Sequence, residues 1–265
     1  MPIDTGGANP SANGKIAIAF RDVTYRVPNG STRDLVSAIN LTVPQGKTLV
    51  LLGRSGSGKT TLLRLMNGLV LPSQGAVEIQ GRATTEWDRI HLRRGIGYVI
   101  QDGGLFPHFT VAANVALVPT LENWEAGKIQ SRVAEVLQIV GMNPGEYLQR
   151  YPRELSGGQR QRVGVARALA ADPPILLMDE PFGALDPVTR AELQREFREL
   201  ARRLGKTIVF VTHDLREALY LADDIVLMQS GKIVTHSAPQ DFLQLKHPEV
   251  QAFAASLATA SGDPA

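Results

Sequence analysis

The sequence has 265 residues, of which 43% are hydrophobic, so a buried core is possible and general disorder is excluded. Lys plus Arg number 28 against 26 Asp plus Glu, and the resulting formal charge of +2 lacks the excess typical of dedicated nucleic-acid binders. The absence of Cys excludes a disulfide scaffold, a thiol nucleophile and a Cys-ligated zinc site. We therefore expect a globular protein of a reducing compartment, with no nucleic-acid partner.

The first 14 residues, MPIDTGGANPSANG, lack a positively charged start followed by an apolar stretch. They are expected to form a flexible leader at residues 1–14, and not a secretory signal. Later apolar runs are only strand-length, far below the roughly 18 consecutive apolar residues that a transmembrane helix needs. The sequence therefore predicts a chain that does not cross a membrane by itself.

Short apolar runs rich in β-branched residues alternate with helical stretches across residues 15–245, which predicts an α/β domain. Residues 175–178 and 208–211 are apolar without alternation, as in parallel strands that are covered on both faces. The remaining predicted strands are residues 16–20, 49–52, 77–79 and 96–100, with a hairpin formed by 225–228 and 232–235.

Residues 110–155 lack such strand-like runs and show helical patterning instead, clearest at residues 128–140. We expect a helical subdomain, about residues 102–159, inserted in the core. Its helices should be interrupted at Pro119, Gly141, Pro144 and Pro152. Helix is expected again from about Pro239, and residues 246–265 are expected to form a C-terminal helix and a flexible tail.

A glycine-rich loop directly follows the strand at residues 49–52 and matches the phosphate-loop pattern G-x-x-x-x-G-K-[ST]. Its backbone N–H groups and the helix that begins near Gly58 would surround phosphate oxygens. Lys59 would reach the β- and γ-phosphates, and the Thr60 hydroxyl would ligate Mg²⁺. The predicted ATP-binding residues here are Gly53, Arg54, Ser55, Gly56, Ser57, Gly58, Lys59, Thr60 and Thr61.

Two adjacent carboxylates, Asp179 and Glu180, end the apolar strand at residues 175–178. Side chains alternate along a strand, so the two cannot project in the same direction. Asp179 is therefore predicted to hold Mg²⁺, and Glu180 to polarise an attacking water. By itself this pattern is weak, because apolar strands that end in acids are common at sheet edges.

A second glycine pair stands in residues 155–159, Leu-Ser-Gly-Gly-Gln, at the start of a helical run over residues 160–170. A Ser hydroxyl and two glycines at a helix N-terminus form an anion site, although a simple capping turn has the same composition. One nucleotide needs one phosphate loop. The second site is explained if it serves a nucleotide bound to another copy, so that ATP is held between two subunits.

These motifs follow one another in the order found in the ATP-binding-cassette (ABC) family, and the chain resembles that family over about residues 16–245. Residues 53–60 resemble its Walker A loop, and residues 175–180 its Walker B strand. The resemblance implies an α/β P-loop NTPase (RecA-like) core with an antiparallel β subdomain and an inserted α-helical subdomain. The further matches are the signature residues Ser156, Gly157, Gly158 and Gln159, the Q-loop Gln101, the D-loop Asp186 and the switch residue His213.

The resemblance also implies roles for individual residues. Glu180 would be the general base, His213 would contact the γ-phosphate, and Gln101 would link the metal site to the helical insertion. The metal ligands would be Thr60, Gln101 and Asp179, the cofactors ATP and Mg²⁺, and the assembly a head-to-tail dimer. The family stacks adenine on an aromatic residue, but the aligned position is Val27; Tyr25, on the same face of a strand, is the substitute.

The loop after Gln101 should indicate what such an ATPase drives, because it would contact the partner. Its apolar residues Leu105, Phe106 and Phe109 suit a groove that receives a partner's helix, unless they pack on the helical subdomain. This stretch is similar to the importer branch for osmoprotectants such as glycine betaine and choline. The implied partners are a second copy of this chain in a homodimer, or else a second, different cassette, together with membrane permease subunits and an extracytoplasmic solute-binding protein. The chain would be peripheral on the cytoplasmic face. Importers of amino acids or other small polar solutes, a lipid or export system, and a non-transport ABC protein remain alternatives.

Overall fold

The computed structural model describes residues 15–28, 33–101 and 104–259. The leader expected at residues 1–14 lies outside the described residues, as do the end of the expected tail, 260–265, and residues 102–103 at the start of the expected insertion. Within the described residues, no helix combines the length and apolar character needed to cross a membrane.

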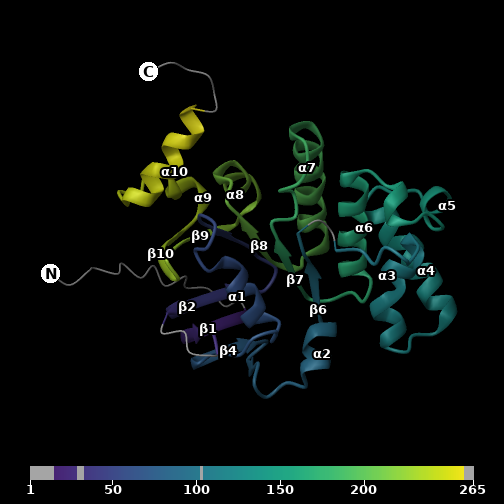
Figure 1. The fold of residues 1–265 in the computed structure, drawn as a ribbon, viewed down its shortest axis with the longest axis horizontal. Coiled ribbons are helices and arrows are strands. Elements are labelled where there is room, and N and C mark those ends of the chain that lie inside the picture. The colour runs from purple at the N-terminus through teal and green to yellow at the C-terminus, as the bar shows by residue number, and fades with distance from the viewer. Residues whose placement is uncertain (1–14, 29–32, 102–103, 260–265) are drawn as a thin grey trace.

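Two sheets form the centre of the molecule (Figure 1). The antiparallel sheet has the order β2-β1-β4-β5, and the larger sheet the order β10-β9-β3-β8-β7-β6, in which all neighbours are parallel except β9 and β10. The strands are β1 (Ile16–Arg26), β2 (Asp34–Pro44), β3 (Thr48–Leu52), β4 (Gln74–Ile79), β5 (Arg82–Ala83), β6 (Ile96–Val99), β7 (Ile175–Asp179), β8 (Thr207–Thr212), β9 (Asp224–Gln229) and β10 (Lys232–Ser237).

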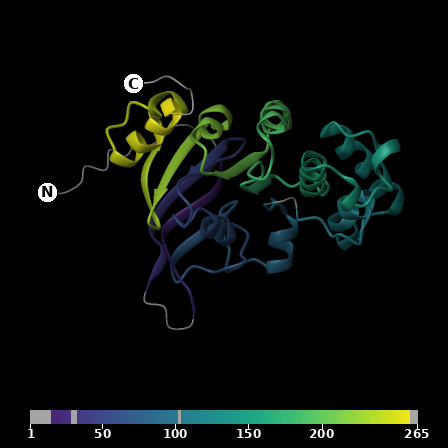
Figure 2. The ribbon, with the colours of Figure 1, turned by 45° about the horizontal axis from the view of Figure 1, so that its top comes forward.

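Helices cover both faces of the larger sheet. Figures 1 and 2 show α3, α4 and α5 gathered at one end of the molecule, beyond α6, while α9 and α10 lie near the opposite end. The helices are α1 (Lys59–Met66), α2 (Arg89–Arg94), α3 (Val111–Leu121), α4 (Ala126–Ile139), α5 (Pro144–Tyr147), α6 (Gly157–Leu169), α7 (Pro187–Leu204), α8 (Leu215–Leu221), α9 (Pro239–Phe242) and α10 (Pro248–Thr259), with a 3-10 turn, η1 (Pro152–Glu154).

The strand register of the larger sheet brings three strand ends together. Strand β8 lies between β3 and β7, with Leu52 opposite Thr212 and Asp179 opposite Val211. Strands β3 and β8 are buried along their whole length, and for β8 the unbroken apolar run at residues 208–211 predicted this. Because ligands of open α/β sheets bind at the carboxyl ends of the strands, this edge is where the loops after β3, β7 and β8 can act together.

Two apolar clusters hold the layers in place. One packs α1 between the two sheets, with Leu62 and Leu65 fully buried there. The other joins the opposite face of the larger sheet to the helices beyond it, and it includes Val133, Val136 and Leu137 of α4. The apolar stripe expected for this helix is therefore its buried face, although the helix begins at Ala126 and ends at Ile139.

Two local expectations were wrong, and one strand was missed. Helix α3 continues through Pro119, which cannot donate a backbone hydrogen bond, and ends two residues later at Leu121. The helix expected from Pro239 onward is two helices, since Pro248 disfavours helical backbone at the residue before it and opens α10. The sequence reading also missed β2, whose outer face carries exposed residues.

Phe210 on β8 tests the core beneath the strand ends. Its ring is fully buried, with ring centroids 5.6 Å from Phe182 and 6.2 Å from Phe197. Phe210→Ala is expected to lower the free energy of unfolding by about 3–5 kcal/mol, because it removes apolar contacts and leaves a cavity. Urea denaturation measures the change. The surface variant Tyr220→Ala should change it by less than about 1 kcal/mol, and equal losses in the two variants would contradict the assignment.

Candidate functional site

The loop between β3 and α1 closes around the ammonium group of Lys59. The Nζ atom donates hydrogen bonds to the carbonyl oxygens of Gly53, at 2.7 Å, and Arg54, at 3.0 Å. Burial lowers the pKa of Lys59, while the nearby carboxylates of Glu180 and Asp179 act in the opposite direction. The predicted phosphate loop thus holds a buried cation at its centre.

The glycines of this loop are required by close packing. A side chain at Gly58 (φ +106°) would put its Cβ 2.8 Å from Val36 Cγ1, and one at Gly53 would lie 2.5 Å from the Met228 carbonyl oxygen. The loop and Glu180 line a cavity of about 280 Å³. In the same loop, the buried Ser57 hydroxyl has no hydrogen-bond partner within the described residues, which fits a site for an anionic ligand.

The end of β7 lies beside the start of α1. The Thr60 hydroxyl donates to Asp179 Oδ1 at 3.1 Å, so the two predicted metal ligands are neighbours. Burial raises the pKa of the Asp179 carboxyl, and the charge of Glu180 adds to the shift, whereas the hydrogen bond from Thr60 opposes it. Burial also raises the pKa of nearby Tyr98 to about 12, so its phenol stays protonated.

Glu180 and His213 face one another across the strand ends. Glu180 Oε2 lies 3.1 Å from His213 Nδ1, and the Glu180 backbone N–H donates to the Val211 carbonyl. Glu180 has φ +44°, a conformation that is uncommon for a residue with a side chain and that concentrates at functional sites. The structure therefore brings the predicted general base and the switch histidine together beside the phosphate loop.

A buried carboxylate, Glu217 on α8, supports the residues around His213, and the sequence reading missed it. It accepts hydrogen bonds from the Thr212 hydroxyl and, at 2.7 Å, from Gln194 Nε2 on α7. Thr212 Oγ1 in turn accepts the backbone N–H of Asp214 at 2.9 Å. The residues on both sides of His213 are thus tied to α7 and α8.

Another contact that the sequence reading missed joins the phosphate loop to the C-terminal helix α10. The exposed Arg54 donates through Nε to Glu249 Oε1 at 2.7 Å, and Gln229 Nε2 donates to the other oxygen at 3.0 Å. Leu35, at the cavity rim, was also missed. These residues lie far from the loop in sequence, so no local pattern could indicate them.

The predicted signature residues lie away from this cavity. Ser156 caps α6: its Oγ accepts the Gln159 N–H at 3.2 Å, and the Gln159 side chain accepts the Ser156 N–H at 2.9 Å. Gly158 packs against α7, where a Cβ would lie 2.7 Å from Thr189 Cγ2. Gly157 is the first residue of the helix. None of these four residues lines the phosphate-loop cavity.

The remaining predicted site residues have other surroundings. Asp186 caps α7, accepting the Thr189 N–H at 3.0 Å, and this bond lowers the pKa of its carboxyl. Gln101 is exposed two residues after β6 and makes no hydrogen bond to Thr60 or Asp179 within the described residues. Tyr25 packs partly against the core between the sheets and Val27 is exposed, and neither lines the phosphate-loop cavity.

Comparison with known proteins decides the family. A sequence profile described as "ABC transporter" matches residues 36–183. This chain belongs to the ABC transporter family. The match covers the phosphate loop, the signature residues and the end of β7. As an ABC-family chain, it contains a nucleotide-binding domain whose expected P-loop NTPase architecture is confirmed by solved cassettes of the same fold.

Two solved structures illustrate the fold. A dimeric ATP-binding cassette in a post-hydrolysis state, bound to ADP and Pi, is 32% identical with a TM-score of 0.75, covering 84% of this chain and 98% of that one. The cassette cbiO1 from Clostridium perfringens, part of an ABC transporter complex, is 25% identical with a TM-score of 0.80, covering 94% of this chain and 100% of that one.

Curated relatives are more similar in sequence. The glycine betaine/carnitine/choline transport ATP-binding protein OpuCA of Bacillus subtilis is 54% identical over 79% of this chain and 55% of its own length. The glycine betaine uptake system ATP-binding protein YehX of Escherichia coli is 50% identical over 78% of this chain and 67% of its own length. The chain thus spans about half the length of relatives such as OpuCA.

Glu217 gives this site a pH-dependent stability. Burial raises the pKa of its carboxyl in the folded protein above the ordinary value of 4.5. The folded state therefore binds more protons, and stability falls as pH rises from about 4.5 through the raised pKa. As pH rises over this range, the unfolding free energy of the wild type should fall relative to that of Glu217→Gln, which has no carboxyl to titrate at this position. Urea unfolding at pH 4.5, 6.0 and 7.5 measures the difference, and a constant difference would contradict the assignment.

Proposed function

We propose that this chain is the ATP-hydrolysing subunit of an ABC importer, and that it couples ATP binding and hydrolysis in a dimer to solute uptake by a separate permease. The observation that carries the proposal is the Glu180–His213 pair, 3.1 Å apart, with Glu180 on the wall of the phosphate-loop cavity. Such a carboxylate can act on a water molecule next to a terminal phosphate.

The phosphate loop binds and orients ATP. Lys59 exchanges the carbonyl oxygens of Gly53 and Arg54 for phosphate oxygens, and its charge is worth more there because the site is poorly hydrated. The Ser57 hydroxyl, which has no partner within the described residues, can donate to another phosphate oxygen. The N-terminus of α1 adds its partial positive charge.

Thr60 and Asp179 are proposed to hold Mg²⁺. Their oxygens, 3.1 Å apart, are the hard donors that this ion prefers. The described residues contain no cluster of three or more His, Cys, Asp or Glu that could hold a metal, so phosphate oxygens and water would complete the coordination. When bound, the ion would neutralise charge that develops on the phosphates. Gln101 remains the proposed third contributor.

Glu180 is proposed to take a proton from the attacking water. His213 orients that carboxylate through Nδ1 and leaves its other ring nitrogen free to contact the γ-phosphate. The strained backbone at Glu180 fixes the direction of its side chain, because the N–H bond to Val211 holds the turn in place. Thr212, Glu217 and Gln194 hold the residues next to His213.

The assembly is proposed to be a head-to-tail dimer. Residues 156–159 lie outside the phosphate-loop cavity of their own chain, which supports their use by a nucleotide on the partner subunit. A structural relative is described as a dimer bound to ADP and Pi. Asp186 caps the start of α7 and would contribute at the same junction. Which residue stacks on adenine, Tyr25 or Val27, stays a prediction.

The proposed cargo is an osmoprotectant such as glycine betaine or choline, because relatives at 54% and 50% identity carry names of such uptake systems. Permease subunits, a solute-binding protein outside the membrane, and a peripheral position on the cytoplasmic face follow from that role. In the loop proposed to receive a permease helix, Phe106 is 42% exposed. The Asn114 side chain holds this loop through the backbone of Phe106 and Phe109, whereas Leu105 packs against the core.

Glu180→Gln tests the general base. The substitution keeps the size of the side chain but removes its basicity, so ATP turnover should fall at least about 100-fold. ATP binding should persist, and the variant should form dimers with ATP. Phosphate release and size-exclusion chromatography with ATP measure the two effects. Glu192→Gln, on the exposed face of α7, is the matched control. Turnover within a few-fold of wild type in Glu180→Gln would reject the assignment.

Uptake of labelled glycine betaine tests the cargo. Cells that lack this chain should regain uptake at high osmolarity with the wild-type gene and not with Glu180→Gln. Rescue by both genes would contradict a role for hydrolysis. Uptake that does not depend on the chain would reject this cargo, and a screen of amino acids and other small polar solutes would follow.

A further inference from the structure

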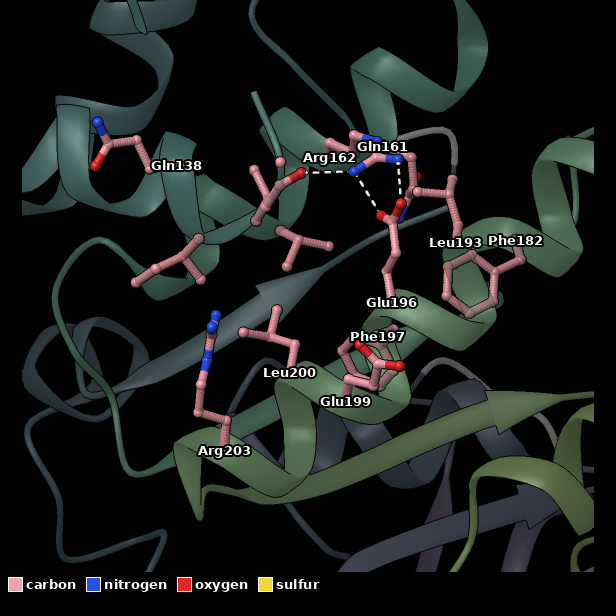
Figure 3. Close-up of a pocket in the computed structure, with 14 residues that line it drawn as sticks. Gln138, Gln161, Arg162, Phe182, Leu193, Glu196, Phe197, Glu199, Leu200 and Arg203 are labelled. Carbon is pink, nitrogen blue, oxygen red and sulfur yellow. Dashed lines mark hydrogen bonds and ion pairs between the residues drawn. The ribbon is translucent and has the colours of Figure 1, made fainter. Parts of the chain in front are cut away.

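A second cavity, of about 400 Å³, lies between α4, α6 and α7 and shares no lining residue with the phosphate-loop cavity. Figure 3 shows Gln161 and Arg162 on one side and Leu200 and Arg203 on the other. Small-molecule sites commonly have volumes of about 300–1,000 Å³. The proposed reaction uses none of the groups that line this space.

One wall of the cavity is apolar. Leu193, Phe197 and Leu200 recur at steps of four and three residues, so they share one face of α7, and Phe182 adjoins them. Each is less than a tenth exposed. A ring or a branched hydrocarbon group can therefore lie against this wall and be removed from water.

A buried hydrogen-bond donor lies at the same cavity. Gln161 on α6 is 3% exposed, and within the described residues its Nε2 has no hydrogen-bond partner. Buried polar groups are nearly always paired, because an unpaired donor loses its bonds to water without replacement. In this arrangement Nε2 is covered, so the amide must turn toward the cavity, after which a ligand with one acceptor oxygen beside its apolar part would pair this donor.

The charges at the cavity cancel. Arg162 is already bound, donating from Nη2 to Glu196 Oε1 at 2.9 Å and from Nη1 to the Val140 carbonyl at 2.7 Å. The other two charged lining residues, Glu199 and Arg203, have opposite signs. The cavity therefore has no net charge that would favour an anion or a cation.

We propose that this cavity binds an uncharged small molecule with an aromatic or branched apolar body and one carbonyl oxygen, which accepts from Gln161 Nε2. The ligand would bridge α6, which begins after Ser156, and α7, which begins after Asp186. Because it would hold these two helices in one arrangement, its binding slows ATP turnover. This second effect rests on the proposed ATPase function, whereas the binding itself does not.

N-benzylacetamide is a suitable probe because it combines a phenyl ring with one amide carbonyl. Saturation-transfer NMR titrations of the full chain should show saturable binding. Phenylacetate and benzylammonium carry the same ring with a negative or positive charge, and they should bind at least about tenfold more weakly. Equal binding of all three compounds would overturn the proposed ligand class.

Two variants locate the binding. Leu200→Trp fills the cavity and should abolish binding, whereas Leu121→Trp, at a position 46% exposed on α3, should leave it unchanged. Gln161→Leu keeps the side-chain volume but removes the donor, and should weaken binding about fivefold. If Leu200→Trp does not fold, Gln161→Leu remains decisive. Unchanged binding in Gln161→Leu, expected if a water molecule pairs the donor, would overturn the proposal.

Turnover tests the coupling separately. At saturating ATP, a probe concentration of several times its Kd should lower wild-type turnover at least twofold and leave Gln161→Leu less affected at the same concentration. Bound probe with unchanged turnover would overturn the coupling. Absence of turnover without probe would instead reject the proposed ATPase function, and the NMR titration would still decide the site.

Discussion

The parallel pairing of β3, β8 and β7 is the constraint on which the rest of the site depends. Hydrogen bonding between the strands sets Leu52 beside Thr212 and Val211 beside Asp179. The phosphate loop, the acid pair and His213 each follow one of these strands, so their side chains meet although they are distant in sequence. If one of these strands slipped by one residue, its side chains would turn to the other face of the sheet and its loop would move away from the other two.

Around this edge the structure uses polar bonds to fix positions that apolar packing cannot fix. Lys59 is held by two carbonyl oxygens, Thr60 by Asp179, and Glu180 by His213 and the Val211 carbonyl. Apolar contacts are non-directional and tolerate small displacements, whereas these bonds fail over a few tenths of an ångström. The polar contacts therefore set the directions of these side chains, and the buried strands beneath support them.

Much of the fold could be predicted from the sequence because the signals are local. The buried strands β7 and β8 have unbroken apolar sequences, and the acid pair and His213 follow them directly. Strand β2 was missed because solvent covers one of its faces and polar residues interrupt its apolar pattern. Glu217, Gln194 and Glu249 were missed for a different reason: their partners are set by the packing of helices, which no sequence window contains.

The ion pair between Arg54 and Glu249 gives α10 a direct connection to the predicted phosphate loop. The carbonyl oxygen of the same arginine is one of the two that hold the Lys59 ammonium. A displacement of α10 would therefore pull on a residue of this loop, and a change of the loop would pull on the helix. Thermodynamic linkage would make such an effect mutual, so any influence of α10 docking on a ligand in the loop would be matched by an equal influence of that ligand on α10.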